Sequence, residues 1–252
     1  MSQLCVRLLG PVEVEACGTV ITIGRPKVRT LLAVLALDVG RVVSNDRLTD
    51  ALWGLDLPDD PHHALHMYVS RLRKLHPAIK QAVVTATCGY SLQLASGHID
   101  AVRFERVTAA AQRRIRSNPR LAVRAFDGAL AMWRGEALGD LGYKEFASGT
   151  VRRLEELRLT TIEDRYDAAI RMGAAAEVLP QLHQLAREHA LRDRPIELLL
   201  QAMQEAGKHS DVRSAYREYC ERLERDYGLP PSPGLRRLAA SNGSRRTETA
   251  WA

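Results

Sequence analysis

The chain has 252 residues, of which 46% are hydrophobic, 5% aromatic and 26% charged, and its formal net charge is +6. This length allows two modest domains or one large one. Residues 1–98 hold ten Lys and Arg against eight Asp and Glu, and residues 99–252 hold twenty-six against twenty-two. Because positive charges exceed negative ones only slightly in each part, neither part is a polycation that would bind nucleic acid through its overall charge. Any anionic partner must therefore be bound by individually placed Lys and Arg side chains.

The cysteines and the apolar runs indicate the cellular compartment in which the chain is expected. Cys5, Cys17, Cys88 and Cys220 form no CxxC pair and have no zinc-like spacing to histidine, which favours a reduced cytoplasmic protein. The N-terminus lacks a signal-peptide pattern, and the longest apolar run, residues 31–37, is too short to cross a bilayer. We therefore expect no membrane partner, no metal and no other cofactor.

The first hundred residues predict a small domain of mixed strands and helices. The expected elements are three short strands (4–9, 12–16 and 20–23), three helices (26–38, 45–53 and 61–75) and a β-hairpin (83–87 with 90–94). Val42 and Val43 are expected to form only an extended link between the first two helices. Strands, three helices and a hairpin in this order are typical of a winged helix-turn-helix with an added N-terminal sheet.

From residue 99 onward the pattern is almost wholly helical. Helices are expected near 100–116, 120–133, 145–171, 174–189, 194–206 and 210–227, with a short one near 233–240. Paired helices of this length suggest a TPR-like helical-repeat domain, and an irregular helical bundle would show the same pattern. We predict a mainly α chain with a small β part, divided into a winged-helix domain (1–98), a helical domain (99–242) and a flexible tail (243–252).

The predicted third helix separates apolar from polar side chains. Asp60 can cap its N-terminus, and Pro61 suits its first turn. Its apolar residues recur at helical spacing and predict a buried stripe: Leu65, Val69, Leu72 and Leu75. Its other face carries His63, His66, Met67, Ser70, Arg71 and Lys74, with Arg73 beside it. The pattern fits a helix in a DNA groove, and it also fits an ordinary basic surface helix.

Several motifs along the chain occur together, and in order, in one known family. In the first part they are Leu9-Gly10-Pro11, Arg41-Val42-Val43-Ser44, Ala51-Leu52-Trp53-Gly54, Val69-Ser70-Arg71-Leu72-Arg73 and Gly89-Tyr90. In the second part they are Ala129-Leu130, Trp133-Arg134-Gly135, Leu154-Glu155-Glu156-Leu157-Arg158, Glu188-His189 and Leu223 through Gly228. Over about residues 4–240 the chain resembles the Streptomyces antibiotic regulatory protein (SARP) family, in the short form without an ATPase domain.

The resemblance implies an OmpR-type winged helix followed by a bacterial transcriptional activation domain. It implies a sequence-specific activator of a secondary-metabolite (antibiotic) gene cluster, located in the cytoplasm and on the nucleoid when bound to DNA. Members bind promoter direct repeats as dimers or paired protomers and recruit RNA polymerase holoenzyme through its sigma factor. No enzyme is expected, because the chain has no phosphate-binding loop, GxSxG or HExxH motif.

In such a fold the third helix is the expected major-groove reader. Arg71 is the first candidate for a base contact, because a guanidinium can pair with O6 and N7 of guanine. The other candidates on this face are His63, His66, Met67 and Ser70. Expected phosphate ligands are Arg73 and Lys74, the helix-start cations Arg25, Lys27 and Arg29, and the hydroxyls of Thr85 and Thr87 in the wing.

Three points depart from this pattern or leave a choice open. Relatives often carry an arginine near Ala86, whereas residues 85–88 hold no cation, so a minor-groove arginine contact is in doubt. Leu55, Asp56 and Asp59 precede the third helix and are candidates for polymerase contact, or simply part of a solvated acidic loop. His62 and His66 lie one helical turn apart but have no third ligand for a metal.

Two other functions remain open from the sequence. One is a protein-interaction adaptor that works through its helical repeat and carries a degenerate winged helix. The other is a repressor that uses the same DNA-binding face.

Overall fold

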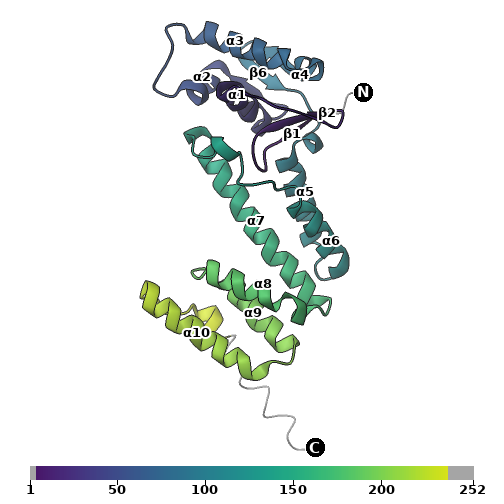
Figure 1. Ribbon diagram of the computed structural model, residues 1–252, viewed down its shortest axis with the longest axis vertical. Coiled ribbons are helices and arrows are strands. Elements are labelled where there is room, and N and C mark those ends of the chain that lie inside the picture. Colours follow the sequence, from purple (N-terminus) through teal and green to yellow (C-terminus); the bar gives the residue numbers. More distant parts are fainter. Residues whose placement is uncertain (1–3, 238–252) are drawn as a thin grey trace, which may run out of the picture. The chain divides into compact units, whose positions relative to one another are not determined.

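The computed structural model describes residues 4–237, with small sheets and helices in the first hundred residues and an almost wholly helical chain after them (Figure 1). The first part comprises β1 (Leu4–Arg7), β2 (Glu13–Ala16), β3 (Thr19–Ile21), α1 (Pro26–Leu37), β4 (Val42–Ser44), α2 (Asn45–Trp53), α3 (Pro61–Lys74), α4 (Pro77–Ala82), β5 (Val83–Ala86) and β6 (Gly89–Leu92). The remaining elements are η1 (Ser96–His98), α5 (Asp100–Gln112), α6 (Pro119–Leu130), η2 (Gly139–Leu141), α7 (Glu145–Arg171), α8 (Ala175–Glu188), α9 (Asp193–Glu205) and α10 (His209–Tyr227). The predicted mainly α fold with a small N-terminal β part is confirmed.

The strands form two antiparallel sheets. β1, β2 and β3 are neighbours in sequence order, and the second sheet has the order β4-β6-β5. The expectation that Val42 and Val43 form only a link was wrong, because Val43 pairs with Tyr90 in this second sheet. Gly89 permits that pairing, since a Cβ there would lie 1.9 Å from the carbonyl oxygen of Val43.

The sequence did not reveal α4, which follows α3 after a short turn. Nδ1 of His76 accepts the N–H of Ala78 at 3.1 Å, and Pro77 occupies the first turn. Only Ile79 and Ala82 of this helix are buried, too few to produce a periodic pattern. Leu75, predicted to be in the buried stripe, is instead 36% exposed, because α3 ends at Lys74 and the chain turns there.

Packing divides the described chain into two units. Unit 1 contains residues 4–109 and 128–159, and unit 2 contains residues 110–127 and 160–237. The core of unit 1 joins Leu9 and Phe104 to Trp133, Leu138 and Leu154. Residues from the second half of the sequence therefore complete the core around the first hundred. The predicted domain limits at 98 and 242 remain predictions, and the predicted tail, residues 243–252, lies outside the described residues.

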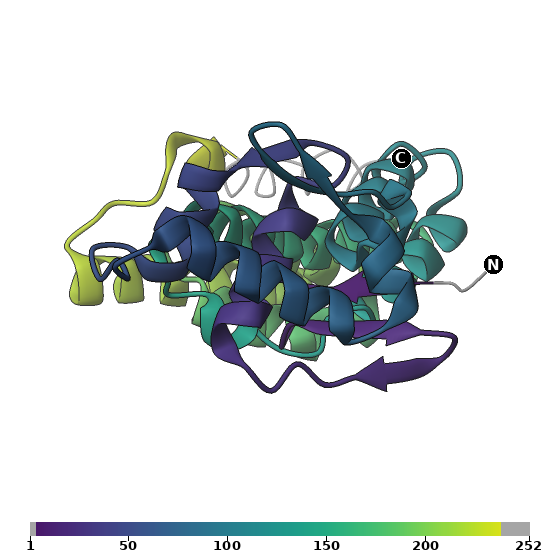
Figure 2. The same ribbon diagram turned by 90° about the horizontal axis from the view of Figure 1, so that it is seen from above.

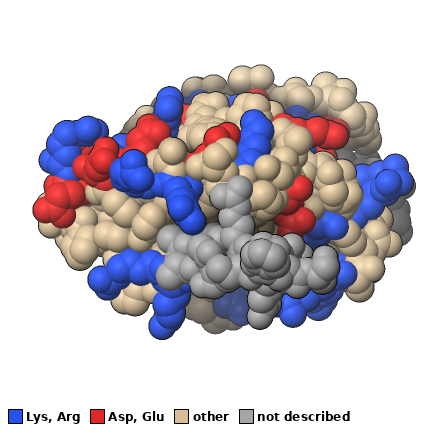
Figure 3. Space-filling model, turned by 90° about the horizontal axis from the view of Figure 1, so that it is seen from below, with Lys and Arg blue, Asp and Glu red and all other residues tan. Residues whose placement is uncertain are grey.

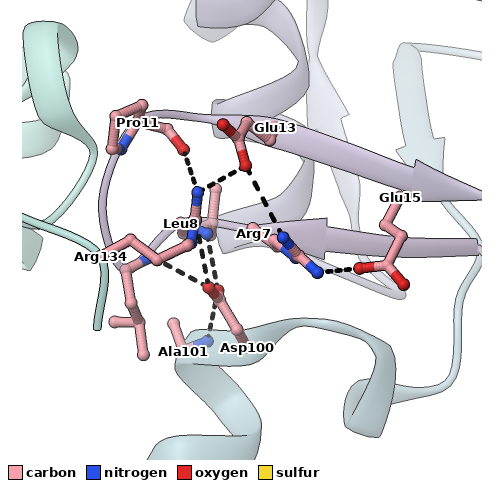
Figure 4. A network of polar contacts seen from close by, with 9 residues as sticks. Arg7, Leu8, Pro11, Glu13, Glu15, Asp100, Ala101 and Arg134 are labelled. Carbon is pink, nitrogen blue, oxygen red and sulfur yellow. Dashed lines mark hydrogen bonds and ion pairs between the residues drawn. The ribbon is translucent and has the colours of Figure 1, made fainter. Parts of the chain in front are cut away.

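A polar network joins the end of β1 to the start of α5 within unit 1 (Figure 4). The Asp100 carboxylate accepts N–H bonds from Leu8 at 2.6 Å, Leu9 at 3.1 Å and Ala101 at 2.8 Å. The guanidinium of Arg134 lies 3.7 Å from the same carboxylate, and the backbone N–H of Arg134 donates to the Leu9 carbonyl at 2.8 Å. Burial raises the pKa of Asp100, while the N–H bonds and Arg134 act in the opposite direction.

Unit 2 is built around α8, α9 and α10, with α9 packed against both of the others. Its core includes Leu182, Leu199, Tyr219 and Leu223. Side chains of both signs are interspersed on the face seen from below in Figure 3. No helix among residues 4–237 combines the length and the apolar character needed to cross a bilayer.

Candidate nucleic-acid interface

α3 begins and packs as its sequence predicts. The Asp60 carboxylate accepts the N–H of His63 at 2.9 Å, and Pro61 is the first helical residue. The buried residues are Leu65, Val69 and Leu72. α3 contains no Asp or Glu, and three of its last four residues are cationic. Figure 2 shows α3 across the front of unit 1, with its outer side turned toward the viewer.

The outer side of α3 brings together the predicted base-contact residues. His63, His66, Met67 and Ser70 are exposed, as is Lys74, and Arg71 is half-buried. The Arg71 guanidinium lies 5.2 Å from the centre of the Tyr68 ring, which restricts its orientation without neutralising its charge. Among residues 4–237, neither Arg71 nor Lys74 forms an ion pair with a carboxylate.

Arg73 ties α3 to the hairpin. Its Nε and one terminal nitrogen, NH2, donate to the Val83 carbonyl at 3.1 and 2.8 Å, and NH2 also donates to Thr85 Oγ1 at 2.9 Å. The guanidinium lies 5.8 Å from the centre of the Tyr90 ring. These contacts leave the other terminal nitrogen, NH1, for a phosphate. The predicted phosphate contact of Arg73 stays a prediction.

A second bond joins α3 to the hairpin through His66. The Tyr90 hydroxyl and His66 Nδ1 are 2.7 Å apart, and the two rings meet edge to face. Burial raises the pKa of Tyr90, with Arg73 acting against it, so the hydroxyl keeps its proton at neutral pH. When that hydroxyl donates to Nδ1, the imidazole proton is on Nε2, where it can donate to an acceptor on DNA.

The three cations at the start of α1 differ in what they contact. Arg25 is exposed and precedes the helix, and Lys27 lies 4.9 Å from the centre of the Trp53 ring. Arg29 forms an ion pair with Asp140 in η2. Arg25 and Lys27 are therefore more accessible to a phosphate than Arg29, and all three phosphate contacts stay predictions.

The hairpin and the loop before α3 carry the remaining candidates. Thr85 and Thr87 are exposed, and no Lys or Arg occurs between residues 83 and 92. Leu55 is fully exposed, and Asp56 and Asp59 are exposed with it in the loop between α2 and α3. The phosphate and polymerase contacts of these residues stay predictions. Among residues 4–237, no three His, Cys, Asp or Glu side chains are grouped to hold a metal ion.

A groove between α3, α4 and the hairpin adds residues that sequence reasoning missed. Its volume is about 750 Å³, and its lining consists of His66, Val69, Ser70, Arg73, Lys74, His76, Pro77, Lys80, Thr85 and Tyr90. His76 and Lys80 were not candidates because no helix was expected at 77–82. The available local signal was Pro77, which suits the first turn of a helix.

Two family models match consecutive parts of the chain. The family described as "Transcriptional regulatory protein, C terminal" matches residues 21–92. The family described as "Bacterial transcriptional activator domain" matches residues 99–241.

Individual proteins show the same likeness over most of the chain. Transcriptional regulator RedD of Streptomyces coelicolor is 34% identical, over 93% of this chain and 69% of its own length. Regulatory protein DnrI of Streptomyces peucetius is 30% identical, over 92% of this chain and 89% of its own length. Regulatory protein AfsR of Streptomyces coelicolor is 34% identical, but the matched part is only 23% of its length.

A solved structure agrees with these matches. EmbR of Mycobacterium tuberculosis, in complex with a low-affinity phosphopeptide, superimposes with a TM-score of 0.91 at 30% identity, over 97% of this chain and 66% of that one. The motifs, the winged-helix geometry and these comparisons together show that the chain belongs to the SARP family of DNA-binding transcriptional regulators, with an OmpR-type domain followed by a bacterial transcriptional activator domain.

Proposed function

We propose that this regulator is an activator that binds promoter direct repeats with α3 in the major groove. The observation that carries the proposal is the outer side of α3, which is cationic, free of acidic residues and turned away from the core. Arg71 reads a guanine, and a good bidentate pair of this kind is worth about 1–3 kcal/mol of discrimination. Ser70 and Met67 flank it, and Lys74 contacts the phosphate backbone.

Activation then depends on surfaces other than α3. The exposed loop holding Leu55, Asp56 and Asp59 offers apolar and acidic side chains to a basic surface of RNA polymerase holoenzyme, including its sigma factor. Two protomers pair on the direct repeats. Membership of the SARP family supports a secondary-metabolite (antibiotic) gene cluster as the target.

A binding measurement tests the role of Arg71. Fluorescence anisotropy on the upstream region compares wild type with Arg71→Ala and with Arg213→Ala, which removes the same charge from an exposed site on α10. Arg71→Ala should weaken specific binding by about 10- to 100-fold and non-specific binding much less. Equal effects of the two substitutions would contradict the assignment. No salt-sensitive, sequence-selective binding by wild type would favour the adaptor function.

Run-off transcription with purified holoenzyme tests activation. Transcripts should increase with added protein. A variant with Leu55→Ala, Asp56→Ala and Asp59→Ala should bind DNA as wild type does but yield fewer transcripts. Transcripts that fall as protein is added would show a repressor, and unchanged activation by the triple variant would exclude the loop as a polymerase contact.

A further inference from the structure

The groove beside α3 has the chemistry of an anion-binding surface. Arg73 and Lys74 line it from α3, and Lys80 lines it from α4. The imidazoles of His66 and His76 and three hydroxyl groups complete its polar lining, and none of its lining residues is acidic. The formal charge of the lining is therefore strongly positive in a chain whose overall charge is nearly balanced.

Lys80 is held in place by the packing of the short helix that carries it. α4 packs against both α3 and β5. Ile79 and Ala82 anchor one side in the core, while Lys80 is exposed. Among the described residues, Lys80 has no ion-pair partner. Its ammonium group is thus available on a rigid element at the base of a hairpin that has no cation of its own.

Arg73 joins the two sides of this groove. Because its Nε and NH2 atoms donate hydrogen bonds to Val83 and Thr85, the guanidinium links α3 directly to β5. The full charge of the side chain still contributes to the potential of the groove.

We infer that the groove holds a segment of the DNA phosphate backbone, with Lys80 contacting a phosphate from the α4 side and Lys74 from the α3 side. This rests on the proposed function, in which α3 lies in the major groove. DNA is the occupant that fits because the groove shares His66, Ser70 and Lys74 with the outer side of α3, so the surface that meets the bases continues into it. Lys80 supplies the cation that the hairpin lacks.

The salt dependence of binding tests this inference in the full chain. Association constants are measured over a range of salt concentrations for wild type, Lys80→Ala, Lys80→Arg and the charge-matched Arg213→Ala, on a specific and on a scrambled duplex. Lys80→Ala should lower the slope of log K against log salt by about 0.9 and weaken binding to both duplexes by about three- to tenfold. Lys80→Arg should restore most of the affinity, and Arg213→Ala should stay within about twofold of wild type.

The outcomes separate this inference from the proposed function. If wild type binds selectively, Arg71→Ala loses selectivity and Lys80→Ala behaves as Arg213→Ala does, the inference fails and the proposed function stands. If wild type shows no selective binding, both fail. Thermal melting of Lys80→Ala should match wild type because the side chain is exposed, and a loss of affinity without a change in melting assigns the effect to contact with DNA.

Discussion

α3 and the second half of α7 both carry arginines, and they use them in opposite ways. On α3, Arg71 and Lys74 face outward without a carboxylate partner among the described residues. On α7, Nε of Arg171 donates to Asp167 at 2.9 Å. A cation paired within its own fold contributes to stability, whereas an unpaired one is available to an external anion. Unpaired cations on a helix that carries no acidic residue, rather than the net charge of the chain, therefore support the proposed DNA-binding role of α3.

Truncation after residue 98 should have the largest effect. It retains every residue of α3 but removes Trp133, Leu138 and Leu154 from the core of unit 1. The exposed apolar surface should abolish the cooperative thermal transition and selective DNA binding together, as followed by circular dichroism and anisotropy. A fragment of residues 1–159, which keeps all of unit 1, should retain both. A cooperative transition in the 1–98 fragment would contradict this account of the core.

Arg192→Ala should have the next largest effect, a loss of stability. Nε of Arg192 donates to Glu163 at 2.5 Å, and Glu163 is only 2% exposed, so the substitution leaves a buried carboxylate without its main partner. We expect a loss of about 2–3 kcal/mol in the free energy of unfolding, measured with urea. Arg71→Ala, the comparison from α3, should cost less than about 0.5 kcal/mol. Equal losses would remove the distinction between paired and unpaired cations.

The stability loss of Arg73→Ala should lie between those of Arg192→Ala and Arg71→Ala. Unlike Arg71, Arg73 forms hydrogen bonds within the fold. Loss of its bonds to Val83 and Thr85 should cost about 1–2 kcal/mol and also weaken DNA binding, since the hairpin is less firmly held. Arg73→Lys keeps the charge but not the forked hydrogen bonds, so it should not restore stability. Full recovery of both stability and binding in the lysine variant would show that only the charge matters.

The smallest effect should be the pH dependence of the difference in unfolding free energy between wild type and Asp100→Asn. Burial raises the pKa of Asp100 above its usual 3.8, so the folded state binds a proton more readily than the unfolded state. The corresponding stabilisation is fully present below the unfolded pKa and is lost as pH rises through the folded pKa. The stability of wild type relative to Asp100→Asn should therefore be greater near pH 4 than near pH 7 in urea unfolding. An opposite trend would show that the N–H bonds from Leu8 and Leu9 outweigh burial.

Sequence predicted those features that short-range chemistry determines. Asp60 caps α3 as expected, and Ser44 caps α2 in the same way, because a cap needs only a suitable residue before a periodic segment. The pairing of β4 could not be predicted, because Val43 gains its partner Tyr90 only when the chain folds. The ion pair of Arg29 depends on Asp140, 111 residues later in the chain.

The outer face of α3 was predictable as a surface but not in its detail. The spacing of Leu65, Val69 and Leu72 fixed which side is buried, and so which side carries Arg71. The bonds of Arg73 to the hairpin and the position of Lys80 depend on tertiary packing that helical periodicity does not describe. Sequence reasoning therefore predicted the exposed cationic face of α3 and missed the groove beside it.

The most direct test combines the substitution Arg71→Ala with the removal of a single base atom, N7 of guanine. Each guanine of the bound repeat is replaced in turn by 7-deazaguanine, which lacks the N7 acceptor, and affinities are measured for wild type and Arg71→Ala. At one guanine in each repeat, the base change should weaken wild type about tenfold or more and have almost no effect on Arg71→Ala, because the contact is already lost. If the two changes are additive at every guanine, Arg71 does not read a base, and the assignment of α3 as the major-groove reader through this residue is wrong.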